Sequence, residues 1–146
     1  MSVHEQFMLE AIAEAGKSPG EVPVGAVIVR EGRIIARAHN ERGDSLPFAH
    51  AEMLAMQRAC EALHTRRLAD CTLYVTLEPC PLCAGGMILA GLGKCVFGAY
   101  DPAQGCCGSV YTLPEDRHFY HTVSCIGGIL ENECKALLQA FFRDKR

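Results

Sequence analysis

One histidine, two cysteines and one glutamate stand at spacings that suit metal chemistry. Cys80 and Cys83 form a Cys-x-x-Cys pair, and His50 and Glu52 form a His-x-Glu pair earlier in the chain. One His and two Cys ligands leave the fourth tetrahedral position of a zinc ion open for water, as in catalytic sites. Zinc brings the pKa of bound water to about 7, and an unligated carboxylate beside it, here Glu52, can take up and return the proton.

The Cys-x-x-Cys pair has two further interpretations. In a thioredoxin-like protein Cys80 and Cys83 would form a redox disulfide, but this leaves His50 and Glu52 without a role. A closed structural zinc site would need a fourth ligand, and the sequence offers His39, His64 and Cys71 but no second Cys-x-x-Cys. A histidine at a helix start, taken alone, is most often a cap or a surface group. The conjunction of both pairs favours the hydrolytic zinc site.

The surrounding elements predict how these residues meet. An apolar strand at 72–77 is followed by a helix at 81–90, which places the two cysteines at a helix N-terminus. There the free backbone N–H groups and the helix dipole favour thiolate over thiol. His50 opens a preceding helix at 50–63. Helix N-termini in strand–helix units gather at one edge of the sheet, where ligands bind, so we expect His50 and the cysteines to meet there.

The remaining pattern predicts an α/β protein with a hairpin near its start. The expected further strands are 22–29, 33–38, 94–98 and 121–125, with a first helix that ends at Gly16. The order α-β-β-α-β-α-β-(β)-α predicts one three-layer α/β/α domain over residues 1–146, with a mixed five-stranded sheet. Two buried stripes are expected: Met53, Met56, Cys60 and Leu63 on the second helix, and Leu130, Cys134, Leu137, Leu138 and Phe141 on the last.

Composition excludes several classes of protein. Hydrophobic residues make up 49% of the 146 residues, yet no apolar run approaches the roughly 20 that cross a bilayer, so we expect no membrane partner. Nine scattered cysteines and a polar N-terminus predict a reducing, cytoplasmic location. The net charge of −3 excludes polyanion binding by bulk electrostatics, so a nucleic acid would need a local patch. The basic candidates are Arg66, Arg67, Lys94 and residues 143–146.

His50-Ala51-Glu52 together with Pro79-Cys80-Pro81-Leu82-Cys83 resembles the signature of the zinc-dependent nucleobase deaminases of the cytidine deaminase superfamily. Within that superfamily the chain is similar to the bacterial tRNA-specific adenosine deaminases. The likeness covers nearly the full length, in segments that follow one another in the same order: 21–29, 49–53, 72–80, 96–102, 105–109, 128–130 and 141–143.

The resemblance implies a cytidine deaminase-like fold, a homodimer, and one zinc ion per subunit held by His50, Cys80 and Cys83. It implies that Glu52 shuttles the proton while adenosine becomes inosine at the wobble position of an arginine tRNA, flipped out of the anticodon loop.

The resemblance also implies that Asn40, the backbone N–H of Ala51, and Asp101 contact the target nucleotide. The alternatives are an Asx-type turn for Asn40 and a loop cap for Asp101. The alternative function is a zinc deaminase that acts on a free nucleobase or nucleoside of the guanine or cytosine type.

Overall fold

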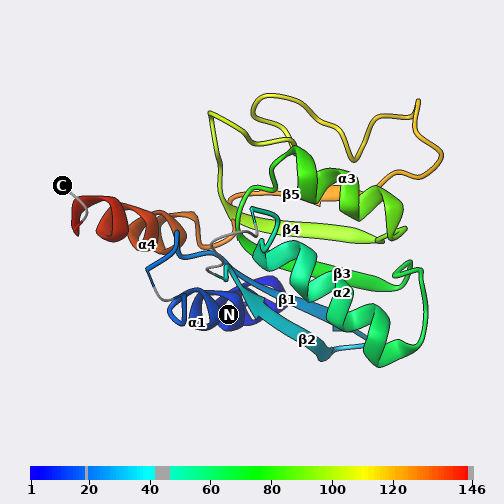
Figure 1. The fold of residues 1–146 in the computed structure, drawn as a ribbon, viewed down its shortest axis with the longest axis horizontal. Coiled ribbons are helices and arrows are strands. Elements are labelled where there is room, and N and C mark those ends of the chain that lie inside the picture. The colour runs from blue at the N-terminus through cyan, green and yellow to red at the C-terminus, as the bar shows by residue number, and fades with distance from the viewer. Residues whose placement is uncertain (19, 42–46, 145–146) are drawn as a thin grey trace.

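A mixed sheet in the strand order β2-β1-β3-β4-β5 organises the computed structural model (Figure 1). The structure describes residues 1–18, 20–41 and 47–144. Strand β1 pairs antiparallel with β2 and with β3, whereas β3, β4 and β5 run parallel to one another. The elements are α1 (Val3–Ala15), β1 (Gly25–Arg30), β2 (Arg33–His39), α2 (Ala51–Leu63), β3 (Cys71–Leu77), α3 (Pro81–Leu89), β4 (Lys94–Ala99), β5 (Ser124–Ile126) and α4 (Glu131–Asp144).

Helices cover both faces of the sheet, which confirms the predicted three layers. Alternate residues of a strand point to opposite faces, so each central strand supplies two cores. Ile28, Leu73 and Phe97 pack with α2 and α3 in one core, and Figure 1 shows these two helices on the same side of the sheet. Val27 and Tyr74, the neighbours of two of these residues, pack with α1 and α4 in the other core.

The first strand begins at Gly25, three positions later than predicted. Pro23 has no N–H with which to join a ladder. Instead, the segment before β1 is held by Asn40, which bonds to the carbonyl oxygens of Val22 and Val24. The last strand is shorter than predicted for a similar reason: Val123 gives its N–H to Pro114, so pairing starts at Ser124.

The buried side of α2 differs from the predicted stripe. Its fully buried residues are Ala51, Glu52, Ala55, Met56 and Ala59, whereas Met53, Cys60 and Leu63 are only partly buried. Alanine side chains let the helix axis approach the sheet, and the larger apolar residues fill its flanks. On α4 only Cys134 of the predicted stripe is fully buried, so this helix leaves much of its apolar side uncovered in the described structure.

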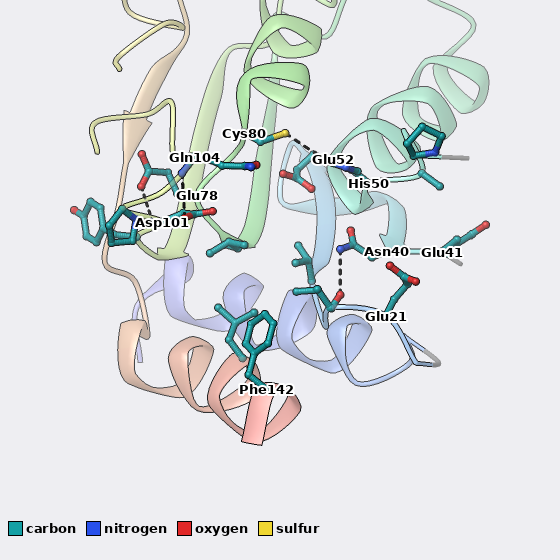
Figure 2. A pocket seen from close by; sticks show the side chains of 18 residues that line it. Glu21, Asn40, Glu41, His50, Glu52, Glu78, Cys80, Asp101, Gln104 and Phe142 are labelled. Carbon is teal, nitrogen blue, oxygen red and sulfur yellow. Dashed lines mark hydrogen bonds between the residues drawn. The ribbon is translucent and has the colours of Figure 1, made fainter. Parts of the chain in front are cut away.

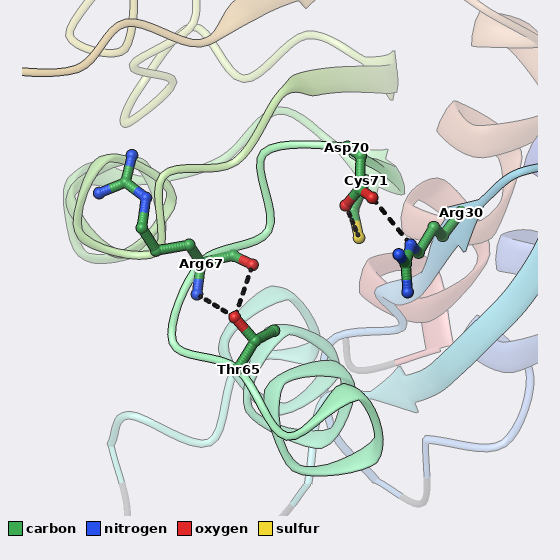
Figure 3. A network of polar contacts seen from close by, with 5 residues as sticks. All are labelled: Arg30, Thr65, Arg67, Asp70 and Cys71. Carbon is green, nitrogen blue, oxygen red and sulfur yellow. Dashed lines mark hydrogen bonds and ion pairs between the residues drawn. The ribbon is translucent and has the colours of Figure 1, made fainter.

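The connection between α2 and β3 determines where β3, the strand that leads to Cys80 and Cys83, begins (Figure 3). The Thr65 hydroxyl accepts a hydrogen bond from the Arg67 N–H and donates one to the Arg67 carbonyl, which closes the turn. Asp70 then pairs with Arg30 at 2.8 Å. Because Arg30 and Cys71 are register partners, this ion pair joins the end of β1 to the start of β3.

The cysteines are all free thiols, and six of the nine are fully buried, as expected of small apolar core residues. Among the described residues, none of the helices combines the length and the apolarity that a bilayer span requires.

Candidate active site

His50, Cys80 and Cys83 meet at the carboxyl end of β3, as predicted. Nδ1 of His50 lies 3.5 Å from Sγ of Cys80 and 3.4 Å from Sγ of Cys83, and the three ligand atoms all lie within 4.8 Å of one another. A tetrahedral zinc ion with usual bond lengths separates a nitrogen from a sulfur ligand by about 3.5 Å. The donor set therefore fits zinc as it stands.

Helix N-termini present two of the three ligands. His50 is the N-cap residue of α2 and Cys80 that of α3, and neither uses its side chain to cap its helix. Pro81 suits the first position of α3, where its missing N–H has no partner to lose. A hydrogen bond from Cys83, together with the contact to His50, lowers the pKa of the Cys80 thiol to about 4. Cys80 is therefore ready as a thiolate ligand.

The alternative of a closed structural zinc site lacks its fourth ligand. In the part of the chain that the structure describes, His50, Cys80 and Cys83 form the one group suited to a metal ion. None of the candidates His39, His64 and Cys71 joins them. His50 and Cys80 line the neighbouring cavity, so a zinc ion held by the three ligands would keep a position for water, as a catalytic site requires.

Glu52 lies beside the ligands without belonging to their group. Figure 2 shows its side chain next to His50 and Cys80 at the inner end of the cavity. The side chain is buried, and this burial raises the pKa of the carboxyl to about 7. A carboxyl group whose pKa lies near neutrality can both accept and return a proton.

A cavity of about 720 Å³ leads from the ligands to the surface, within the usual range for small-molecule sites. The loops after β2 and after β4 and the helix α4 form its walls. Figure 2 shows Phe142 on the α4 side of the cavity. Polar, charged and aromatic side chains line it together with one leucine: Asn40, Glu41, His50, Glu52, Tyr100, Asp101, Leu138 and Phe142.

Asn40 lines the cavity, but its amide is already bonded within the protein. Its Oδ1 accepts the N–H of Ala51 at 2.8 Å, and its Nδ2 donates to the carbonyl of Val22 at 3.1 Å. The first bond reaches the start of α2, so it is not the local Asx turn that was the alternative. Ala51 is fully buried, and its N–H faces Asn40. The bond to Ala51 ties the end of β2 to the helix that follows His50, and the bond to Val22 ties it to the segment before β1.

Asp101 caps its own loop at the wall of the cavity. Its Oδ1 accepts the N–H groups of Ala103 at 3.0 Å and Gln104 at 3.2 Å, which is the loop cap of the alternative. The residue also lines the cavity. The cap holds the loop after β4 in the shape that forms the cavity wall.

Sequence reasoning missed three residues around the cavity. Leu138 packs against the core, as the predicted stripe implies, but it also lines the cavity from α4, and so does Phe142, which was not predicted. Glu78 follows the strand directly and is not among the predicted site residues, but its side chain is only 2% exposed. Burial raises the pKa of this carboxyl, and hydrogen bonds from Ser109, Asp101 and Cys107 outweigh burial and hold the pKa below its usual value. An acid directly after an apolar strand is a signal that such donors must exist.

Most of the basic candidates lie away from the cavity. Arg66 and Arg67 precede β3 and Lys94 begins β4, so they stand at the sheet edge opposite the ligands. Arg143 lies on α4 beside Phe142, next to the cavity. Lys145 and Arg146 are outside the described residues.

Comparison with known proteins places this site in a family. Residues 1–99 match the family described as "Cytidine and deoxycytidylate deaminase zinc-binding region". The chain is 52% identical to the tRNA-specific adenosine deaminase of Bacillus subtilis, over 100% of this chain and 92% of that protein. The chain belongs to the tRNA-specific adenosine deaminase family. The enzyme of the same name from Aquifex aeolicus is 43% identical, over 97% of this chain and 95% of its own.

Solved structures agree with membership of the tRNA-specific adenosine deaminase family. One, from studies of A-to-I editing by tRNA:A34 deaminases at the wobble position, superimposes with a TM-score of 0.81 and 37% identity. It covers 91% of this chain and 99% of its own. A guanine deaminase from Bacillus subtilis has a TM-score of 0.58 and 36% identity, but covers only 68% of this chain. The cytidine deaminase-like fold and the zinc site of the family are thus confirmed in this chain.

Proposed function

We propose that this protein hydrolyses adenosine to inosine at the wobble position of a tRNA anticodon loop. The proposed substrate is arginine tRNA. The observation that carries the proposal is the open zinc site with a buried, unligated Glu52 beside it, in a chain that shares more than half of its residues with a tRNA-specific adenosine deaminase.

The residues of the site have distinct roles in this reaction. His50, Cys80 and Cys83 hold the zinc ion, which when bound supplies a hydroxide-like nucleophile at neutral pH. Glu52 accepts the first proton of the attacking water and delivers it to N1 of the adenine ring. It then takes the remaining proton of the added hydroxyl group and passes it to the amine, which leaves as ammonia while the C6 carbonyl of inosine forms. Its raised pKa suits these transfers, because a carboxyl group with a very low pKa would hold no proton to deliver.

The cavity suits a base that projects from a single-stranded loop. Tyr100 and Phe142 line it and are 43% and 54% exposed, so their rings are available to the flanking bases. Bases of loops are recognised by stacking on aromatic side chains, and flipping them costs less than opening a duplex. Asn40, Ala51 and Asp101 contact the target nucleotide. Asn40 and Ala51 are hydrogen-bonded to each other, so the base must either bond to them in addition to this hydrogen bond or take its place.

Offering the purified protein an anticodon stem-loop of arginine tRNA and, separately, free nucleosides and nucleobases tests the substrate. We expect inosine at the wobble position of the stem-loop and no conversion of free adenosine, cytidine or guanine. A stem-loop with its adenosine moved one position is the control and should stay unmodified. Xanthine or a uracil product from the free compounds, without inosine in the stem-loop, would instead establish the free-base alternative.

The protein acts as a single domain in the cytoplasm. A single domain of residues 1–146 carries the activity, because one sheet with helices on both faces positions every residue of the site. The protein works in the cytoplasm, where its nine free thiols stay reduced and tRNA is present.

The active form is a homodimer joined through an apolar patch beside α3. This patch consists of Leu89, Tyr111, Phe119 and Tyr120, which are 73%, 65%, 44% and 71% exposed. The Tyr120 hydroxyl donates to the Ile88 carbonyl, which places the loop against the end of α3. Large apolar side chains that stay exposed mark protein interfaces where they gather on one face.

Light scattering should find twice the chain mass for the wild type, and about the chain mass for Leu89→Asp. Val3→Asp is the matched control, because Val3 is 62% exposed on α1, outside the patch; this variant should remain a dimer. A monomeric wild type, or a Leu89→Asp dimer as stable as the wild type, would reject this interface.

A further inference from the structure

The carboxylate of Glu78 collects hydrogen bonds from one loop. Its Oε1 accepts the N–H of Asp101 at 2.9 Å, and its Oε2 accepts the N–H groups of Cys107 and Ser109, each at 3.0 Å. The Ser109 hydroxyl donates to Oε1 as well. No Lys or Arg side chain takes part in these bonds. Backbone donors on three separate residues therefore satisfy this buried charge, as such a group requires.

These bonds join the zinc ligands to the wall of the cavity. Glu78 stands two residues before Cys80, and its own N–H donates to the Ala99 carbonyl at 2.8 Å. The carbonyl of Pro79 accepts the N–H of Cys106 at 2.9 Å. The bonded segment, residues 100–109, supplies Tyr100, Asp101, Pro102 and Gln104 to the cavity. The loop of residues 100–109 is therefore held around the Glu78 carboxylate.

The fit around this carboxylate leaves no spare room. A Cβ built on Gly105 would lie 2.3 Å from the Glu78 carboxyl carbon and from its Oε1. The N–H of Gly105 donates to the Asp101 carbonyl at 2.8 Å, so the loop also closes on itself. A side chain at this position would push the loop off the carboxylate.

An amide cannot replace the carboxylate at this position. If the NH₂ group of a glutamine took the place of Oε1, the Ser109 hydroxyl could turn to accept from it, but the Asp101 N–H would face another donor. If it took the place of Oε2, the N–H groups of Cys107 and Ser109 would both face it. In either orientation at least one buried backbone N–H loses its acceptor, and leaving such a group unsatisfied is costly.

We infer that Glu78 is a positioning residue for the deamination reaction: it holds residues 100–109 in the shape that receives the nucleotide, and so acts on substrate binding rather than on the proton transfers. This inference rests on the proposed function for its substrate. Glu78 would then affect KM, whereas Cys80, two residues later, would bind the zinc ion.

Steady-state kinetics of Glu78→Gln with the anticodon stem-loop test this role. We expect KM to rise about tenfold to a hundredfold, the size expected for a charge-assisted hydrogen bond lost at a buried site. The value of kcat should stay within about threefold of the wild type, and the zinc content at one ion per chain. Glu31→Gln, an exposed carboxylate in the turn between β1 and β2, is the matched control and should change neither constant. A fall in kcat at unchanged KM, a loss of zinc, or wild-type kinetics would overturn the inference.

Two further measurements keep the test decisive. Ser109→Ala removes one donor and leaves the carboxylate, so it should raise KM in the same direction by a smaller factor, and it serves if Glu78→Gln fails to fold. Hydrogen exchange of the Asp101 and Cys107 amides needs no substrate: both should exchange faster in Glu78→Gln, and unchanged exchange would reject the positioning role. If the wild type makes no inosine while exchange responds as expected, the proposed function fails and the control of the loop by Glu78 stands.

Discussion

Glu52→Ala should give a folded protein that binds one zinc ion per chain and has lost nearly all turnover. A single proton transfer by a positioned group contributes about 10²- to 10⁴-fold, and Glu52 is assigned more than one transfer. We therefore expect kcat to fall by about 10⁴-fold, measured as inosine formed in the stem-loop. Zinc should remain, because Glu52 is outside the ligand group.

A second carboxylate of the cavity provides the control for Glu52. Glu41 also lines the cavity but is bonded to Arg58 and half-exposed. Glu41→Ala removes a negative charge from the same cavity, and kcat should stay within about threefold of the wild type. Glu52→Gln keeps the shape and removes the titratable oxygen, so it should be nearly as inactive as Glu52→Ala. Normal turnover in Glu52→Gln would show that another group moves the proton.

Cys83→Ser should abolish stoichiometric zinc binding and, with it, activity. The sulfur of Cys83 is fully buried and lies 3.4 Å from Nδ1 of His50. A serine hydroxyl is a poor ligand for zinc compared with a thiolate, so only two of the three protein ligands would remain and the affinity for zinc should fall. Metal analysis of the purified variant should find well below one zinc ion per chain, and inosine formation should be undetectable.

Metal binding and folding are coupled, so the loss should also appear in stability. A ligand present at about 100 times its dissociation constant stabilises the folded state by about 2.7 kcal/mol. A chelator should therefore lower the Tm of the wild type and leave that of Cys83→Ser unchanged. Cys134→Ser is the matched control, because Cys134 is as deeply buried but lies on α4, outside the ligand group. This variant should bind zinc and respond to the chelator. A chelator-sensitive Tm in Cys83→Ser would show that Cys83 is not a ligand.

Proton transfer and metal binding depend on different residues of the site. Glu52 can act only when the three ligands hold zinc, whereas zinc binding by the ligands does not need Glu52. The fold makes this separation possible, because α2 and α3 each present a ligand from the N-cap residue, whereas Glu52 extends from the first turn of α2 and lines the cavity.

The local sequence was sufficient for the elements and for the zinc ligands. Pro81 and the small residues after it predict the start of α3, and Ala51–Leu63 forms a helix close to the predicted 50–63. Both outcomes follow from interactions within a few residues, which a sequence pattern records. Boundaries were wrong where a distant group competes for the backbone, as at Val22 and Val24, whose carbonyls bond to Asn40.

The buried stripes show a second reason for error. Apolar spacing on α2 predicts Met53 and Leu63 as core, but the sheet surface accepts Ala55 and Ala59 at its centre. How closely a helix approaches a sheet depends on the side chains of both. The sequence of the helix does not show which sheet residues will face it.

By itself, the sequence determined the ligand types, the helix N-termini that carry them and the layered fold, because these depend on short-range patterns. Only the tertiary structure decided that His50 lies within bonding reach of the two cysteines, that Asn40 is bonded to Ala51, and that Glu78 holds the loop of residues 100–109. Such contacts join residues that are far apart in the chain, and they follow from how the strands pair and the helices pack. The side chains that hold the metal were therefore visible in the sequence, whereas those that shape the cavity around it were not.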